Sequence, residues 1–449
     1  MVVNLSKTFQ PFKVLVLGDF LLDTYTTGKV RRISPEAPVP VMEVIRHEAR
    51  PGGAGNVALN LHALGGMVVC VGRIGGDVHG EQLKQLLSLK GMDSSGLMVE
   101  RGYITPVKNR LIAGSQQLMR IDSEIISPLD PFLEELLIER VKTWILETQI
   151  VALSDYGKGF LTHRMIQEVL EMAKKGGVPV IVDPKGTDFA KYKGATILKP
   201  NLSEAYAAAK KPPSTPLSEV ASEIFSQASV DLLLITRSEA GMSLFELSGK
   251  RTDFPVVSKE VKDVTGAGDT VLAVLCLGLA NGLDLPSIVQ LSNIAAGIAI
   301  ERLGCVQVTL AELAKRLLET DNRTKIFDES HTYALQQVLQ GKQVSLLVLS
   351  KENSLTLKFL KAIRQLARKK EHEMIVYVCD VAPEDEFVQV LSSLQEIDTI
   401  ILQSESLKHL CETIHPHEVY VLEGETFTRI DQAKEVLTAL IANNSPAKT

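Results

Sequence analysis

The segment D-V-T-G-A-G-D-T, from Asp263 to Thr270, precedes the apolar run Val271 to Leu277. A glycine-rich segment that leads into an apolar run is typical of a loop that turns into a buried helix. Gly266 and Gly268 allow a positive φ and the close approach of a ligand to the backbone. The first amides of such a helix have no intrahelical partner, and the helix dipole favours negative charge there. The segment therefore predicts a phosphate site.

Asp269 lies in the same turn, where another negative charge would not help to bind an anion. A carboxylate beside an anion site can instead accept the proton of a hydroxyl that attacks the bound phosphorus. A glycine-rich turn with an aspartate N-cap is the alternative interpretation of these residues. The rest of the chain has to decide between the two.

The composition indicates a globular protein with two or three domains. The chain has 449 residues, of which 45% are hydrophobic and 23% are charged. A net charge of −6 gives no general attraction to nucleic acid or to an anionic membrane, so we expect neither as a partner. We see no membrane span and no secretory signal, and the five cysteines contain no C-x-x-C pair. These features favour a cytoplasmic protein.

Short apolar runs alternate with helical segments along most of the chain. Such runs begin near residues 13, 68, 150, 178, 196 and 231, and polar residues follow them. This alternation predicts an α/β fold whose central sheet is mostly parallel, with ligand-binding loops at the carboxyl ends of its strands. The polar residues expected at that edge are Asp19, Asn56, Asn201, Glu204, Arg237 and Asp269. For Asp19 and Asp23 the alternatives are a turn aspartate and a helix cap.

Two extended segments have a half-polar pattern that differs from the central runs. Residues 39–52 partly alternate, and Val107 to Asp122 predicts two strands that turn at Gly114-Ser115. A small β lid over the central sheet explains both segments, and a solvated hairpin is the alternative. A lid with exposed strand edges often pairs with a second copy, so we expect a homodimer.

Asn201 and Glu204 stand three residues apart at the start of a predicted helix and therefore share a face. An amide and a carboxylate beside a phosphate site can hold Mg²⁺, usually through water. The alternative is a helix N-cap with a capping-box glutamate. The two interpretations are compatible.

Three motifs together resemble the ribokinase-like (PfkB) carbohydrate kinases: D-V-T-G-A-G-D-T, K-P-N-L-S-E (199–204) and P-G-G-A-G-N (51–56). G-D-F-L-L-D (18–23), R-I-S-P-E-A-P-V-P (32–40) and L-S-D-Y-G-K-G (153–159) narrow the resemblance to the heptose 7-phosphate kinases of lipopolysaccharide biosynthesis. This resemblance covers about residues 12–315. It implies ATP-dependent phosphorylation of D-glycero-β-D-manno-heptose 7-phosphate at O1, on the route to ADP-heptose.

The resemblance also implies roles for individual residues. It makes Asp269 the base, and it makes Gly266, Ala267 and Gly268 the anion hole for the phosphoryl group that is transferred. The residues implied at ATP are Asn201, Leu202, Ser203, Glu204, Arg237 and Thr265, with Mg²⁺ bound to Glu204 through water. The residues implied at the sugar are Asp19, Asp23, Gly52, Gly53 and Asn56. The candidates for the sugar's own phosphate are Arg110, Arg120, Lys158 and Lys185.

The last third of the chain predicts a separate, smaller unit. We expect a kinase domain at 1–318 with its lid at about 39–52 and 107–122, a polar linker at 319–342, and a Rossmann-like α/β domain at 343–449. The bifunctional heptose enzymes carry an adenylyltransferase with G-x-F-D-x-x-H-x-G-H at this place. Here the first strand of the domain is followed by K-E-N-S-L-T-L-K-F-L, without His or Gly. We therefore expect a nucleotidyltransferase-like domain without adenylyltransferase activity.

Two other functional classes stay open. The first is a kinase of the same fold for another sugar or sugar phosphate. The second is a non-catalytic interaction protein in which both halves have lost their chemistry. The residues that the kinase chemistry needs are all present in the first half, whereas those of the adenylyltransferase are missing from the second. This selective loss favours a working kinase.

Overall fold

The structure is a computed structural model of the chain, in which two compact units are distinguished. It describes residues 9–114, 116–256, 261–302, 304–321, 325–328, 331–350, 356–367, 372–379, 381–383, 385–402, 407–423 and 426–430. The larger unit is Gln10–Thr309, and the smaller unit combines Met1–Phe9 with Leu310–Thr449. Among the described residues, no helix combines the length and apolar character needed to cross a membrane.

A nine-stranded sheet forms the centre of the larger unit, with the order β13-β12-β11-β10-β9-β8-β1-β4-β5. Its strands are β1 (Phe12–Gly18), β4 (Gly66–Gly75), β5 (Asp93–Glu100), β8 (Ile150–Ser154), β9 (Val180–Asp183), β10 (Ile197–Leu198), β11 (Leu232–Thr236), β12 (Met242–Glu246) and β13 (Arg251–Phe254). The strands pair in parallel from β11 to β5, and β12 and β13 add an antiparallel edge. The expected mostly parallel sheet is confirmed.

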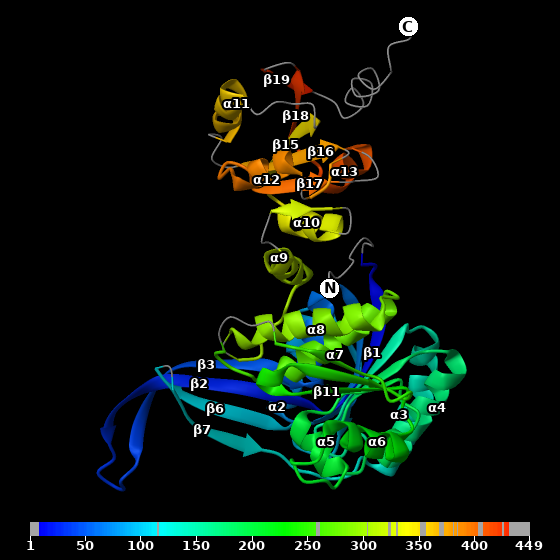
Figure 1. Ribbon diagram of the computed structural model, residues 1–449. Coiled ribbons are helices and arrows are strands. Elements are labelled where there is room, and N and C mark those ends of the chain that lie inside the picture. Colours follow the sequence, from blue (N-terminus) through cyan, green and yellow to red (C-terminus); the bar gives the residue numbers. More distant parts are fainter. Residues whose placement is uncertain are drawn as a thin grey trace. The chain divides into compact units, whose positions relative to one another are not determined.

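Helices flank this sheet (Figure 1). They are α1 (Ala54–Ala63), α2 (Val78–Ser88), α3 (Pro131–Leu146), α4 (His163–Gly176), α5 (Leu202–Ala208), α6 (Leu217–Ala228), α7 (Ala267–Ala280) and α8 (Leu285–Ile300). Helix α7 is buried almost throughout, as the apolar run after Asp269 predicts. Its buried position fixes its N-terminus inside the unit instead of at the surface.

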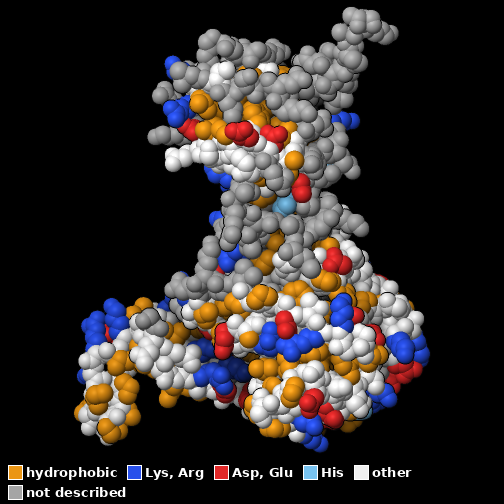
Figure 2. Space-filling view, viewed as in Figure 1, with side chains coloured by type: hydrophobic (Ala, Val, Ile, Leu, Met, Phe, Trp, Pro, Cys, Tyr) orange, Lys and Arg blue, Asp and Glu red, His pale blue; other side chains and the backbone are white. Residues whose placement is uncertain are grey.

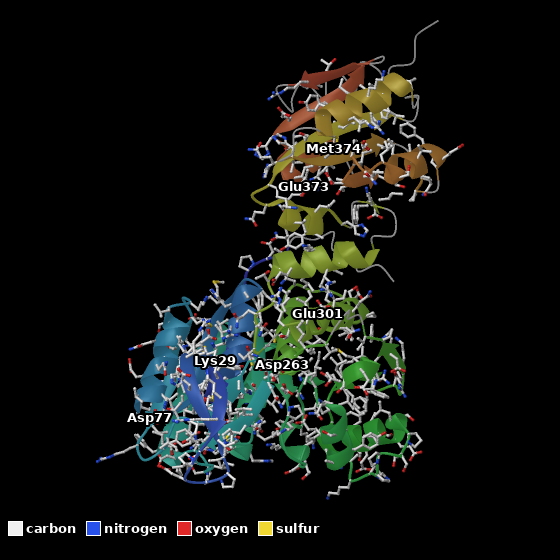
Figure 3. The ribbon with its side chains drawn as sticks, turned by 90° about the vertical axis from the view of Figure 1, so that its left-hand side faces the viewer. Lys29, Asp77, Asp263, Glu301, Glu373 and Met374 are labelled. Atoms are coloured by element: carbon white, nitrogen blue, oxygen red, sulfur yellow. The ribbon has the colours of Figure 1, made fainter. Side chains whose placement is uncertain are left out.

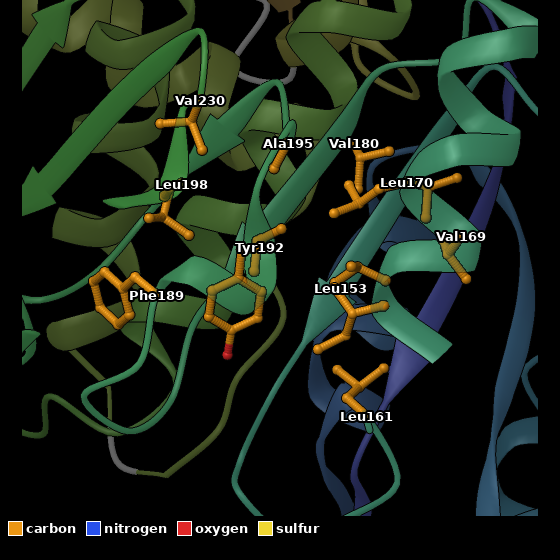
Figure 4. Packing of buried hydrophobic residues seen from close by; sticks show 14 of the residues in the cluster. Leu153, Leu161, Val169, Leu170, Val180, Phe189, Tyr192, Ala195, Leu198 and Val230 are labelled. Atoms are coloured by element: carbon orange, nitrogen blue, oxygen red, sulfur yellow. The ribbon is translucent and has the colours of Figure 1, made fainter. Parts of the chain in front are cut away.

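Helix α4 shows how local sequence fixes one of these elements. The Thr162 hydroxyl accepts the N–H of Met165 at 3.0 Å and caps the helix, and Gly177, with φ 67°, ends it. Apolar residues recur every three or four positions between these ends and are buried. Figure 4 shows this apolar face packed toward Leu153 of β8 and Val180 of β9. The packing anchors α4 on β8 and β9.

A four-stranded sheet, with the order β3-β2-β6-β7, extends from the side of the larger unit (Figure 1). Its strands are β2 (Phe20–Ile33), β3 (Pro40–Gly53), β6 (Val107–Ala113) and β7 (Gln116–Ser123). The sequence predicts the strands at 39–52 and 107–122 but treats Asp23 as a loop residue. Asp23 instead lies in β2, because the segment from Phe20 pairs with both β3 and β6. The proline-rich residues 34–39 form the turn between β2 and β3.

The smaller unit holds a second sheet, with the order β14-β17-β16-β15-β18-β19. Its strands are β14 (Ile326–Phe327), β15 (Gln343–Ser350), β16 (His372–Cys379), β17 (Thr399–Leu402), β18 (Glu418–Glu423) and β19 (Thr426–Ile430). Its helices are α9 (Leu310–Asp321), α10 (Thr332–Leu339), α11 (Leu357–Ala367), α12 (Glu386–Ser393) and α13 (Leu407–Ile414). The chain order reverses between β15 and β18, where an open α/β sheet has its crevice.

The segment expected to be a linker, 319–342, contributes to this smaller unit. Phe327 of β14 and Leu335 of α10 are buried in the same apolar cluster as Leu346 of β15. The polar run at 319–325 suggests a linker, but the apolar residues that follow it pack into a core. Residues 351–355, which follow β15 and carry most of the expected loss of the adenylyltransferase motif, lie outside the described residues.

Candidate active site

A pocket of about 600 Å³ opens at the carboxyl ends of the central strands of the larger unit. It is bounded by the loops that follow β8, β9, β10 and β11 and by the N-terminus of α7. The lining residues that bear charge or hydrogen-bonding groups include Asp155, Tyr156, Asp183, Lys199, Asn201 and Asp269. Of the residues predicted to share this edge, Asn201, Glu204 and Asp269 line the pocket. The pocket therefore lies where the parallel sheet predicts a ligand.

The sequence predicts a positive φ at Gly266 and Gly268 in the turn before α7, and only Gly266 has one. Gly266 is the N-cap of α7 with φ 79°, and a Cβ at this position would lie 2.8 Å from Nδ2 of Asn56. Gly268 does not have the expected positive φ, because it already lies inside the helix. A Cβ at Gly268 would make only an ordinary contact, at 3.4 Å from Nζ of Lys199.

Asp263, labelled in Figure 3, fixes this turn from its other side. Its Oδ1 accepts the N–H of Thr265 at 2.9 Å, and its Oδ2 accepts the N–H of Gly304 at 2.9 Å. Thr270 is the first residue of α7 whose N–H reaches back to the Gly266 carbonyl, at 3.0 Å. The amides of Gly268 and Asp269 precede it and belong to the set that a helix leaves without partners. An anion at this end of α7 would be favoured by these amides and by the helix dipole.

Asp269 is 3% exposed and both of its carboxylate oxygens accept a hydrogen bond. Nδ2 of Asn56 donates to Oδ2 at 2.7 Å, and the Tyr156 hydroxyl donates to Oδ1 at 2.8 Å. Burial raises the pKa of Asp269 to about 7, against the opposing effect of these two donors. A carboxylate with a pKa near neutrality is suited to accept a proton from a hydroxyl group.

Asn56 is itself held by a small buried network. It lies in α1, and Nδ2 of Asn60 donates to its carbonyl at 3.0 Å. Oδ1 of Asn60 accepts the N–H of Val308 at 3.2 Å. The resemblance implies that Asn56 lies at the sugar, whereas the contact seen here is with Asp269.

Asp183 and Lys199 form an ion pair beside the predicted anion site. The sequence does not predict this pair. Nζ of Lys199 lies 2.9 Å from Oδ1 of Asp183, and the two side chains are 3% and 17% exposed. Burial raises the pKa of Asp183, while Lys199 opposes that shift. Both residues follow or end a predicted strand: Asp183 ends β9, and Lys199 comes directly after β10. Their position at the carboxyl ends of strands is the sequence feature that could have indicated them. The pair places a cation in the pocket, close to Gly268 at the start of α7.

Asn201 and Glu204 form the capping box that the sequence offers as an alternative. Oδ1 of Asn201 accepts the N–H of Glu204 at 2.9 Å, and Oε2 of Glu204 accepts the N–H of Asn201 at 3.0 Å. Oε1 of Glu204 also accepts Nζ of Lys185 at 2.7 Å. Each carboxylate oxygen keeps a second lone pair, so Glu204 fits a metal ion that is held through water. Among the described residues, no group of three acidic, His or Cys side chains could bind a metal directly.

The remaining residues assigned to the nucleotide have local structural partners. Arg237 donates to the Ala240 carbonyl at 2.9 Å and lies 3.6 Å from Asp253. Thr265 bonds to Asp263, and the Ser203 hydroxyl donates to Asn201 at 2.7 Å. Leu202 is partly buried against the core. Neither Arg237 nor Thr265 lines the pocket, whose apolar lining includes Val256, Val264, Ala296 and Ile300.

Asp19, assigned to the sugar, accepts three backbone amides. They are the N–H groups of Tyr156 at 2.9 Å, Lys158 at 3.0 Å and Phe160 at 3.4 Å. Burial raises the pKa of Asp19, and these hydrogen bonds oppose the shift. The carboxylate of Asp19 therefore holds the loop at 156–160, from which the Tyr156 hydroxyl reaches Asp269.

Gly52 and Gly53 allow β3 to pass close to the first loop. A Cβ at Gly52 would lie 2.1 Å from Oδ2 of Asp23, and Gly53 has φ 58° at the start of α1. Arg110 donates to the other oxygen of Asp23. The glycines thus bring β2, β3 and α1 together beside Asn56.

Each of the four candidates for the sugar's phosphate already has a carboxylate partner. Besides the pair of Arg110 with Asp23, Arg120 lies 2.7 Å from Asp122 and Lys158 lies 2.6 Å from Glu124. Lys185 pairs with Glu204 at 2.7 Å. Sequence alone does not reveal most of these partners, because three of the four pairs join residues that are 19 or more positions apart.

The fold is that of the ribokinase-like carbohydrate kinases. A crystal structure of a putative ribokinase from Agrobacterium tumefaciens superposes with a TM-score of 0.57 at 19% identity, covering 70% of this chain and 100% of that one. Phosphofructokinase-2 from Escherichia coli, solved in complex with substrates and products, gives 0.57 at 20% identity, covering 70% and 100%. At this identity the likeness concerns the fold.

Residues 12–312 match the family model described as pfkB family carbohydrate kinase, and the chain belongs to this family. It is therefore a sugar kinase. "Bifunctional protein HldE" of Trichlorobacter lovleyi is 46% identical over 330 residues, which cover 73% of this chain and 67% of that protein. The protein of the same name from Geobacter sulfurreducens is 42% identical over 336 residues, covering 74% and 69%.

Proposed function

We propose that the larger unit transfers the γ-phosphoryl group of ATP to O1 of D-glycero-β-D-manno-heptose 7-phosphate. The product would be the 1,7-bisphosphate, on the route to ADP-heptose for lipopolysaccharide. The observation that carries the proposal is Asp269, a buried carboxylate with a pKa raised to about 7 beside the N-terminus of α7. The similarity to proteins named bifunctional HldE supports the choice of heptose.

The chemistry assigned to this chain is positioning and charge neutralisation. Asp269 accepts the proton of the O1 hydroxyl while Tyr156 and Asn56 hold the carboxylate in place. The amides at the start of α7 and the ammonium of Lys199 stabilise the negative charge on the phosphoryl group that moves. When Mg²⁺ is bound, it supplies further neutralisation of the ATP phosphates. Glu204 would hold it through water.

A coupled ATPase assay tests this proposal. The substrates are heptose 7-phosphate, ribose, fructose 6-phosphate and adenosine, each at the same concentration. We expect the highest kcat/KM with heptose 7-phosphate. A higher value with another sugar would support the alternative of a kinase with a different substrate. No turnover with any of the four would favour the non-catalytic alternative.

We also propose that the smaller unit has no adenylyltransferase activity. The support is the sequence after β15, which lacks the two histidines and the glycines of the adenylyltransferase motif. Its sheet has a nucleotide-binding strand order, so the architecture is kept while the motif is absent. Formation of ADP-heptose from heptose 1-phosphate and ATP by the full chain would contradict this.

A homodimer formed through the four-stranded sheet is the proposed assembly. The strands of this sheet and the turn between β2 and β3 expose several large apolar side chains, which a second copy would cover. They are Val30, Ile33, Val39, Val44, Ile45, Leu118, Met119 and Ile121. Sedimentation of wild type and of Ile45→Lys tests it, with a dimer and a monomer as the expected species. We also propose that the enzyme acts in the cytoplasm, where ATP and sugar phosphates are available.

A further inference from the structure

One face of the four-stranded sheet carries a row of charged residues. Side chains two residues apart on a strand share a face, and directly paired residues lie side by side across strands. Lys108 of β6 pairs with Asp23 of β2 and with Asp122 of β7, and Arg110 pairs with Arg120. The alternation therefore puts these five side chains on the same face.

Two of the three cations in this row have a carboxylate within salt-bridge distance: Arg110 has Asp23 and Arg120 has Asp122. Lys158, in the loop that follows β8, likewise has Glu124. Within the described part of the chain, Lys108 forms no salt bridge, although Asp23 and Asp122 attract it from further away. Burial lowers the pKa of Lys108, and the cations Lys158 and Arg120 lower it further. The ammonium group of Lys108 therefore has no carboxylate of its own within salt-bridge distance among the described residues.

Lys108 is also directed toward the catalytic base. Its Nζ lies 5.7 Å from the ring centroid of Tyr156, within the range of a cation–π contact. The hydroxyl of the same tyrosine donates to Asp269 at 2.8 Å. Lys108 and Asp269 thus both contact the side chain of Tyr156. Figure 2 shows Lys and Arg side chains gathered in the hollow beside this sheet.

We propose that Lys108 binds the phosphate that the sugar substrate carries at the end opposite to the hydroxyl activated by Asp269. The assignment rests on the proposed function, in which O1 and the 7-phosphate lie at the two ends of one seven-carbon sugar. A substrate dianion would supply the charge that Lys108 lacks, and it would not have to break one of the three ion pairs. Lys108 is then the residue that selects a phosphorylated sugar over the free sugar.

The test compares Lys108→Met with Lys29→Met, a matched loss of one cation from an exposed position in β2 of the same sheet (Figure 3). We expect Lys108→Met to raise the KM for heptose 7-phosphate about 10- to 100-fold, as for the loss of a hydrogen bond to a charged group. The KM for ATP and the thermal midpoint should stay the same. Lys29→Met should leave all three unchanged, and Lys108→Arg should recover most of the affinity.

The free sugar without its 7-phosphate separates binding of the phosphate from a general effect on the site. Lys108→Met should alter kcat/KM for this sugar by less than about twofold. An equal loss with both sugars, or an unchanged KM for heptose 7-phosphate, would overturn the assignment.

Failure of the proposed function has a different signature, which is no turnover of heptose 7-phosphate by wild type. In that case calorimetry decides the role of Lys108, with heptose 7-phosphate titrated into wild type and Lys108→Met. A Kd that rises at least 10-fold in the variant supports the assignment. Equal Kd values, or no binding to wild type, overturn it.

Discussion

Asp269 and Asp19 are two aspartates of the same unit, each 3% exposed, yet their partners differ in kind. Asp19 accepts backbone amides of one loop, from Tyr156 to Phe160. Asp269 accepts two side-chain donors and lies beside the N-terminus of a helix. A carboxylate bound by backbone amides organises the chain, whereas one bound by side chains can exchange a partner for a substrate hydroxyl. Burial alone therefore does not identify a catalytic carboxylate.

The largest expected effect is that of Asp269→Asn on turnover. The amide has the same shape but accepts no proton, so we expect kcat to fall about 100- to 10,000-fold, the range for loss of general base catalysis. Binding of ATP and of the sugar, measured by calorimetry, should persist. A kcat within a few-fold of wild type would remove Asp269 from the mechanism and end the contrast with Asp19.

Asp19→Asn should act on stability first. The amide group of asparagine would face backbone N–H groups with its own donors, which leaves buried donors unpaired. We expect a loss of about 1–3 kcal/mol in the free energy of unfolding, measured in urea. Asp269→Asn in the same experiment is the control. A larger destabilisation by Asp269→Asn than by Asp19→Asn would reverse the two roles.

Asp269 also predicts how the stability of wild type depends on pH. Its pKa is about 7 in the folded state, above the ordinary value of 3.8, so the folded state retains a proton that the unfolded chain releases. The stabilisation of the folded state by this proton is fully present below pH 3.8, and it is lost as the pH rises through about 7. Melting curves at pH 5 and pH 8 should therefore show Asp269→Asn gaining stability relative to wild type at pH 8. An unchanged difference would show that the pKa is not raised.

Tyr156→Phe should have a smaller effect. The hydroxyl lowers the pKa of Asp269 by donating to it, so its removal raises that pKa and leaves less of the base ionised at neutral pH. If the pKa rises by about one unit, the ionised fraction at pH 7 falls from about one half to about one tenth, so we expect kcat to fall by about fivefold. At pH 8.5 the loss should be smaller. An equal loss at both values would mean that Tyr156 acts only through packing.

Local patterns are sufficient for the parts of the molecule that local sequence determines. The alternation of apolar runs and helices predicts the parallel sheet, and the segment around Asp269 predicts the start of a buried helix. The capping box of Asn201 and Glu204 also follows from residues three apart. In each case the interacting groups are close in the sequence, so their spacing carries the information.

The contacts that complete the site join distant residues and leave no such pattern. Tyr156 meets Asp269 across 113 positions, and Arg110 meets Asp23 across 87. The sequence therefore indicates Arg110 as a candidate for the phosphate but does not reveal its partner Asp23, and no pattern distinguishes Lys108. In the smaller unit, Phe327 follows a polar run and gives no sign of the core into which it packs.

The pH dependence of kcat/KM for heptose 7-phosphate tests most directly whether Asp269 is the base. Wild type should lose activity as the pH falls below about 7, with a slope that corresponds to one proton, because burial raises the pKa of this carboxyl to about 7. A profile that stays flat from about pH 5.5 to 8.5 would contradict the account.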